Sequence, residues 1–269
     1  MLRKGLSPNA VLACGALALA TFAATRSPQF GQVWCVAAYL IGLFSCWRAS
    51  ALYPRNSPMR LGWLALGCNC FLSVFRHAAL VFESTAATDY RIHMISQALQ
   101  LPALLSVLLG LGAMWWGVYR LGLGFRVRWR ECAGIVLAAA IITWTFRNNL
   151  SHAHSPYGLL TILQAISLGV LVAIAGVALL LNALSLQMGG GRLAVVMRCV
   201  AVYALTRCLL TLVQADRDNF SLLWWLTFYA VPWIFAFAAA YSCWLADGVR
   251  RSIRQQPGSR WLETESTHL

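Results

Sequence analysis

Charged residues are scarce in this sequence of 269 residues, and acidic ones are the scarcest. Charged residues make up 11% of the chain, only eight are aspartate or glutamate, and 60% of the residues are hydrophobic. The mean hydropathy is +0.67. A soluble globule of this composition has too little polar surface to face water, so we expect an all-α, polytopic membrane protein.

Other absences exclude several chemistries. The one lysine, Lys4, precedes the first apolar run, so no Schiff-base lysine lies in the bundle. No apolar run has an acidic residue near its middle, which argues against a proton relay or a sodium site. Walker, GxSxG and HExxH motifs are also missing. Cys68 and Cys70 are one residue apart with no second pair, which does not match zinc-ligand spacing.

The net charge of +13 needs an explanation other than nucleic acid. Nearly all of it is arginine in short segments between apolar runs, as the positive-inside rule describes. We therefore expect membrane lipids as partners and no nucleic acid.

Apolar runs of about 20 residues, the length that crosses a bilayer, recur along the chain. They predict eight spans, at residues 9–25, 31–49, 61–82, 94–119, 131–147, 158–183, 193–214 and 221–246. The first also fits a cleavable signal peptide, which would leave seven spans. The domain organisation expected is a single bundle, 1–246, with a short polar tail, 247–269.

The arginines and the lysine fall unequally on the two sides of these spans. Fourteen lie at the N-terminus, in alternate loops and in the tail, four lie in the other loops, and three lie within spans. This split predicts that both termini are cytoplasmic. We expect a multi-pass protein of a bacterial cytoplasmic (inner) membrane.

An internal repeat emerges at an offset of 131 residues. Arg76, with Cys68 before it and Glu83 after it, matches Arg207, with Cys199 and Gln214 at the same spacings. Pro102 and Pro232 each lie eighteen residues before an arginine. The pattern predicts a parallel repeat of four plus four spans, in units 1–130 and 131–250. The alternative is chance self-similarity in an alanine- and leucine-rich sequence.

Two spans carry a polar stripe at helical spacing. In the third span it comprises Asn69, Ser73, Arg76 and Glu83, and in the seventh Tyr203, Arg207, Thr211, Gln214 and Asp218. A buried arginine is unfavourable unless it is paired or hydrated, so we expect the stripes to face each other near the bundle axis. The alternative is snorkelling, because a guanidinium about 9 Å below the end of a span can extend toward the headgroups.

Polar side chains also gather at the predicted outer ends of other spans, which suggests an outward-facing polar pocket. The candidate ligand-binding residues are Arg76, His77, Gln97, Gln100, Gln164, Tyr203, Arg207, Thr211 and Gln214. Because guanidinium groups bind carboxylates and phosphates through paired hydrogen bonds, the expected ligand is anionic or lipid-like.

Three histidines in predicted outer segments support a weaker hypothesis. Imidazoles of His93, His152 and His154 could bind zinc or copper. An HxH in a loop is a weak signal, and no other cofactor is expected.

These observations favour a non-enzymatic receptor, sensor or accessory subunit that acts with a membrane protein partner. Two alternatives stay open. One is a small transporter or channel for an anionic solute, which needs a polar path to both sides of the membrane. The other is an enzyme acting on a lipid at the outer leaflet, with a histidine as base or metal ligand.

Overall fold

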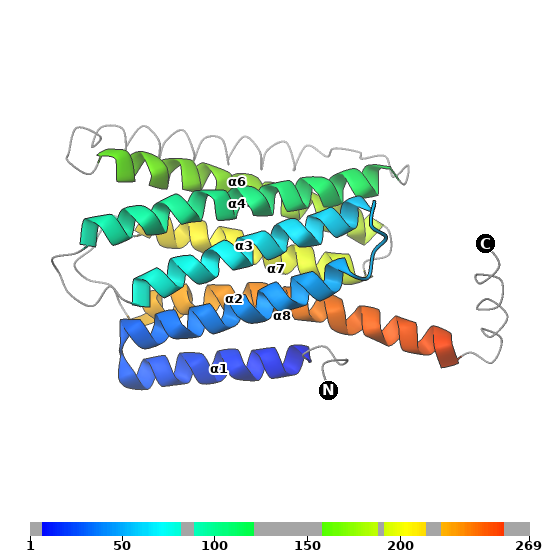
Figure 1. Ribbon diagram of the computed structural model, residues 1–269, viewed down its shortest axis with the longest axis horizontal. Coiled ribbons are helices and arrows are strands. Elements are labelled where there is room, and N and C mark those ends of the chain that lie inside the picture. Colours follow the sequence, from blue (N-terminus) through cyan, green and yellow to red (C-terminus); the bar gives the residue numbers. More distant parts are fainter. Residues whose placement is uncertain (1–6, 82–88, 121–157, 188–190, 214–221, 256–269) are drawn as a thin grey trace.

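The fold is a bundle of long helices. The computed structural model describes residues 7–81, 89–120, 158–187, 191–213 and 222–255, and within them no strand occurs. The helices are α1 (Pro8–Thr25), α2 (Pro28–Ser50), α3 (Pro58–Val81), α4 (Asp89–Tyr119), α6 (Gly158–Gln187), α7 (Gly191–Val213) and α8 (Leu222–Gln255) (Figure 1). All seven are long and apolar enough to cross a membrane. The predicted all-helical, multi-pass class is confirmed, and the expected span at 131–147 lies outside the described residues.

Local sequence explains how the first two helices meet. The Ser7 side chain accepts a hydrogen bond from the Ala10 amide, and Pro8 follows as the first helical residue. Arg26 adopts a left-handed conformation (φ 50°) that ends α1, and Pro28 then begins α2. Proline suits the first turn because the amide it lacks has no helical partner there. The link is therefore short and the two helices are antiparallel neighbours.

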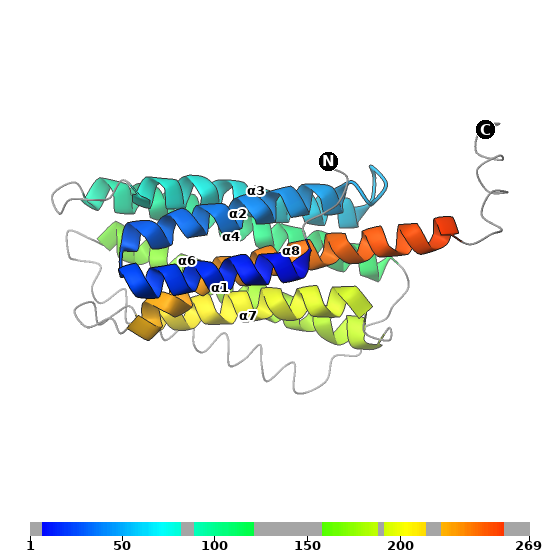
Figure 2. The same cartoon turned by 90° about the horizontal axis from the view of Figure 1, so that it is seen from below.

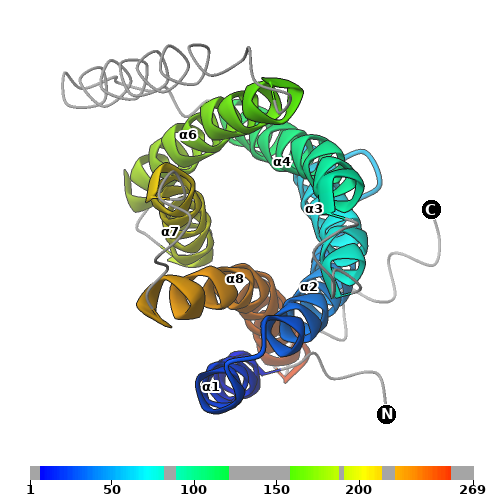
Figure 3. The same ribbon diagram turned by 90° about the vertical axis from the view of Figure 1, so that its left-hand side faces the viewer.

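Six helices form a closed ring when the bundle is viewed end-on (Figure 3). Each of α2, α3, α4, α6, α7 and α8 contacts the next in this order, and α8 contacts α2. Among the described helices, α1 contacts α2 and α8 alone and lies outside the ring. In this order α3 is opposite α7, α4 is opposite α8, and α2 is opposite α6.

The directions of the helices define the two ends of the bundle. α1, α3 and α7 end where α2, α4, α6 and α8 begin (Figures 1 and 2). α4 and α6 thus run in the same direction although they are adjacent in the ring. The beginning of α1 and the end of α8 lie toward the same end of the bundle.

Glycines allow α3 and α4 to approach each other closely. A Cβ atom on Gly62 would lie 2.9 Å from the Gly110 carbonyl oxygen, and one on Gly110 would lie 2.9 Å from the Gly62 carbonyl oxygen. These distances are too short for ordinary contacts. Small residues are what allow membrane helices to pack this closely.

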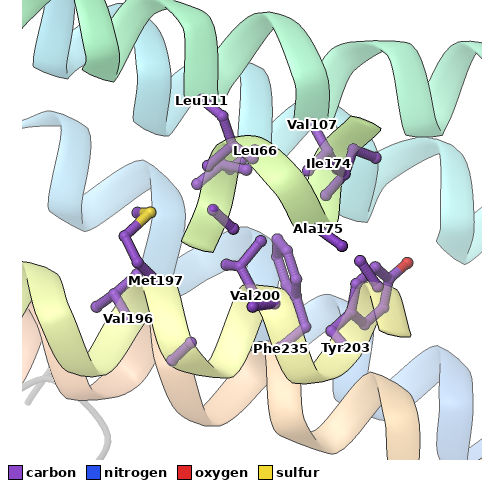
Figure 4. Close-up of a cluster of buried hydrophobic side chains, with 14 of the residues drawn as sticks. Leu66, Val107, Leu111, Ile174, Ala175, Val196, Met197, Val200, Tyr203 and Phe235 are labelled. Carbon is purple, nitrogen blue, oxygen red and sulfur yellow. The ribbon is translucent and has the colours of Figure 1, made fainter. Parts of the chain in front are cut away.

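Large apolar side chains fill the interior of the ring over much of its length (Figure 4). Leu66, Leu111, Ile174 and Met197 converge there from α3, α4, α6 and α7, and each is at most 1% exposed. The larger buried polar side chains lie beyond this apolar core, toward one end of the bundle.

Candidate functional site

The larger buried polar side chains gather near one end of the bundle. On α3, Asn69, Ser73, Arg76 and His77 follow the core residue Leu66 along the helix. Other helices also have buried polar residues in the part that lies at this end of the bundle. These residues are Gln32 on α2, Ser96, Gln97 and Gln100 on α4, Ser167 on α6 and Arg207 on α7. We call this the polar end; it is the end where α1, α3 and α7 finish and it faces the viewer in Figure 3.

Arg76 is held inside the bundle by the neighbouring helix. It is 7% exposed, and its Nε donates a hydrogen bond to Ser96 Oγ on α4 over 3.1 Å. The bond orients the guanidinium and leaves the N–H groups of its two terminal nitrogens for other acceptors. Arg198 on α7 shows the contrast, because it is exposed and its Nε donates to Asn182.

Arg207 occupies an equally buried position on the opposite side of the ring. It is 7% exposed, and its guanidinium carbon lies 5.3 Å from the centroid of the Phe228 ring on α8. Phe228 in turn stacks on Trp224, with ring centroids 5.4 Å apart. A cation over an aromatic face gains about 0.5–2 kcal/mol, more as water is excluded.

The two arginines come from helices that do not contact each other within the described part, and both are buried. The charge of Arg207 acts on Arg76, and both charges act on the ring of His77, the residue after Arg76 on α3. None of the eight acidic residues lies in α3 or α7. The predicted partners Glu83, Gln214 and Asp218 lie outside the described residues. The described part of the site is therefore strongly cationic.

His77 is enclosed by polar and aromatic neighbours. Its Nδ1 is 2.5 Å from Gln32 Oε1, and its ring stacks on Tyr39 with centroids 5.3 Å apart. It is 1% exposed. Its second nitrogen, Nε2, is buried without a hydrogen-bond partner among the described residues. A buried acceptor or donor left unpaired is unfavourable, so this atom marks a position where a ligand or water belongs.

Three further polar groups share this property. Both side-chain atoms of Asn69, Gln97 Oε1 and Ser167 Oγ are buried without a hydrogen-bond partner in the described part. All lie on helices of the ring and are buried. Unpaired polar groups of this kind are rare in folded proteins and need an explanation.

Comparison of the chain with protein-family models, with curated proteins and with solved structures gave no match. The functional argument therefore rests on the chemistry of these residues.

Six of the nine predicted ligand residues are buried in the ring: Arg76, His77, Gln97, Gln100, Tyr203 and Arg207. Tyr203 lies deeper than Arg207 and packs edge-on against Phe235, with ring centroids 5.3 Å apart. Gln164 is half-buried on α6. For Thr211 only the backbone is described, as part of α7, and Gln214 lies outside the described residues.

The predicted metal ligands are not tested. His93 belongs to α4, but only its backbone is described, and His152 and His154 lie outside the described residues. Elsewhere in the part that the structure describes, no three histidine, cysteine or acidic residues group as metal ligands would. Zinc or copper binding stays a prediction.

Three residues of the site were not among the sequence candidates: Gln32, Ser96 and Phe228. Gln32 carries the signal used for Gln97 and Gln164, a polar residue near the same end of a predicted span, and could have been included. Serine and phenylalanine are common in membrane helices, so nothing in the sequence marks Ser96 or Phe228 as partners of an arginine.

Proposed function

We propose that this protein is a non-enzymatic membrane receptor, sensor or accessory subunit that binds an anionic or lipid-like ligand at its polar end. The observation that carries the proposal is the burial of Arg76 and Arg207, two cations on opposite helices of the ring whose charges act on each other. Two like charges buried together repel each other, and an anion between them offsets that repulsion. The free protein is thus prepared for a negatively charged group.

The chemistry of the two side chains supports this ligand class. Guanidinium groups bind carboxylate or phosphate oxygens with two parallel hydrogen bonds. Ser96 fixes the orientation of one of them, and Phe228 lies against the other. Orientation set before binding reduces the entropy lost on binding.

The apolar core favours a receptor over a transporter. Beyond the polar end the ring is filled by side chains such as Leu66, Leu111 and Met197, all nearly inaccessible. Among the described helices, these apolar side chains lie beyond the position of a ligand bound at Arg76 and Arg207. Binding of the ligand would be sensed as a change in how α3 and α7 pack, which a membrane protein partner could read.

We further propose eight spans in a parallel four-plus-four arrangement. α4 and α6 run in the same direction, so an odd number of crossings separates them, and 131–147 is the apolar segment available. With the arginine-rich segments in the cytoplasm, the polar end faces outward and both termini face inward, as in a bacterial cytoplasmic membrane.

The burial of α3 and α7 supports the repeat. At the offset of 131 residues, seven of the nine buried positions on α3 correspond to buried positions on α7: Trp63 and Ala194, Leu66 and Met197, Asn69 and Val200, Cys70 and Ala201, Ser73 and Ala204, Arg76 and Arg207, His77 and Cys208. The other two, Gly62 and Gly67, correspond to half-buried Leu193 and exposed Arg198. The order of the helices around the ring is also compatible with a repeat that pairs α2 with α6, α3 with α7 and α4 with α8.

This arrangement favours a second candidate function, a small transporter or channel for an anionic solute. Parallel and inverted repeats are common in transporters, with the substrate site at the interface of the repeats. Arg76 and Arg207 would then be equivalent residues of the two halves.

The test compares anion binding by the purified protein and by Arg76→Gln and Arg207→Gln variants. Thermal unfolding of the protein in detergent is followed with inorganic phosphate, and in nanodiscs with phosphatidic acid. We expect ligand to raise the melting temperature of the wild type, and each variant to bind at least about tenfold more weakly. Arg198→Gln, on the exposed face of α7, is the matched control and should bind as the wild type does.

Two results would contradict the receptor proposal. Unchanged binding in both variants would remove the arginines from the site. Phosphate flux into liposomes containing the protein, abolished by Arg76→Gln, would instead support the transporter.

A further inference from the structure

The protonation of His77 follows from its hydrogen bond. In the structure the Gln32 amide presents its carbonyl oxygen Oε1 to the ring, and because this oxygen can only accept, Nδ1 of His77 is the donor. In a neutral imidazole with the proton on Nδ1, the other nitrogen carries a lone pair. Nε2 of His77 is therefore an acceptor, and it is the atom that has no partner among the described residues.

The ring that carries this acceptor lies within the range at which both cations act on it. His77 directly follows Arg76 on α3, and its ring centroid is 6.3 Å from that of Phe228, the ring that Arg207 covers. The charges of Arg76 and Arg207 both act on the imidazole. Two cations beside it oppose protonation of the ring, which keeps Nε2 an acceptor.

The nearby polar atoms without a hydrogen-bond partner among the described residues include both acceptors and a donor. Gln97 Oε1 and Asn69 Oδ1 are acceptors, whereas Asn69 Nδ2 is a donor. A group made only of acceptor oxygens, such as sulfate, satisfies the arginines and leaves His77 Nε2 and Gln97 Oε1 unpaired. A metal ion is disfavoured at Nε2, because two guanidinium charges repel it.

We propose that the ligand of this site is an anion that carries its own hydrogen-bond donor, specifically a phosphate group that retains a proton, which binds Arg76 and Arg207 through its oxygens and donates its O–H to His77 Nε2. This inference rests on the proposed anion-binding function and names the class of anion. The phosphate could be free in solution or be the phosphomonoester headgroup of a lipid, since the two share this chemistry.

The experiment compares anions that differ in the donor. Inorganic phosphate keeps at least one O–H at neutral pH, and sulfate has none, so their affinities are measured side by side by calorimetry on the protein in detergent. For the lipid source, nanodiscs with phosphatidic acid, a monoester, are compared with nanodiscs with phosphatidylglycerol, a diester without an O–H on its phosphate. This pair is measured at about pH 5, because a phosphomonoester keeps its O–H only below its second pKa of about 6. We expect the donor-bearing member of a pair to bind at least about tenfold more tightly.

His77→Phe removes the acceptor and keeps an aromatic ring against Tyr39. In this variant we expect the preference for phosphate over sulfate to fall to about equality, while sulfate affinity stays within about twofold of the wild type. The sulfate measurement also shows that the variant is folded. If His77→Phe does not fold, the ratio of the phosphate and sulfate affinities of the wild type tests the inference.

The outcomes separate this inference from the proposed function. Equal affinity of the wild type for phosphate and sulfate, and for the two lipids, overturns the inference and leaves anion binding in place; this is also the result expected if water satisfies Nε2. A preference that survives His77→Phe overturns it as well. Binding of none of the four probes overturns both. A preference seen with free phosphate assigns the source to solution, and one seen with phosphatidic acid alone assigns it to the bilayer.

Discussion

Arg76 Nε donates to Ser96 Oγ over 3.1 Å, so a residue of α4 orients the charge that α3 carries into the ring. The bond connects the charged stripe on α3 to the glutamine pair that follows on α4, Gln97 and Gln100. An arginine held in this way presents its terminal nitrogens in a fixed direction, which is what distinguishes a binding group from a charge that reaches for lipid headgroups.

Ser96→Ala removes this orientation and keeps the charge. We expect phosphate affinity to fall by about threefold to tenfold, because the guanidinium must be ordered at the moment of binding. Calorimetry measures the change. Ser106→Ala is the control, since the Ser106 hydroxyl donates to the Ala103 carbonyl of its own helix. Equal affinities in the two variants would show that Ser96 has no part in the site.

Gln32→Leu tests the hydrogen bond to His77. The substitution leaves Nδ1–H buried without its acceptor, and a loss of about 1–3 kcal/mol in the free energy of unfolding is expected. Gln29→Leu, at an exposed position three residues earlier on α2, should change it by less than about 0.5 kcal/mol. The comparison is made by thermal unfolding in the same detergent, and similar stabilities would mean that the bond contributes little.

The sequence was sufficient to predict the features that depend on one helix at a time. Length and apolarity located seven described helices, and a spacing of three and four residues placed Arg76 on the same face as Asn69 and Ser73, a face that the structure buries. The stripe on α7 was found in the same way, and its described members Tyr203 and Arg207 are buried too.

The partners across helices could not be predicted in this way. Which residue faces Arg76 depends on the crossing of α3 and α4, and that crossing is fixed by contacts such as Gly62 with Gly110, which have no signature in hydropathy. The same reason explains why Phe228 was not recognised. Its contact with Arg207 depends on the packing of α7 against α8, and apolar runs in the sequence predict each helix separately without its neighbours.

Gly110→Ala tests the crossing itself. The added Cβ would meet the Gly62 carbonyl oxygen at 2.9 Å, so α3 and α4 must separate, and we expect a loss of about 1–3 kcal/mol in stability together with weaker phosphate binding. Gly112→Ala is the control on the same helix, because a Cβ there meets no atom within 4 Å. If both variants unfold at the same temperature, the two helices can adjust without cost.

Substituting the acidic residues predicted beside the arginines tests whether the counter-ions of Arg76 and Arg207 are carboxylates of the protein or an external anion. Glu83 lies seven residues after Arg76 and Asp218 eleven after Arg207, on the same stripes. If the ligand is external, a Glu83→Gln/Asp218→Asn protein loses competing carboxylates, and its affinity for phosphate should stay equal to the wild type or rise. If these carboxylates are the counter-ions of the arginines, their loss leaves buried charges unpaired and should lower stability by about 3–5 kcal/mol. Thermal unfolding with and without phosphate separates the two cases, with Glu263→Gln in the C-terminal tail as the control. If the double variant loses much stability and the wild type does not bind phosphate, the two arginines have a structural role.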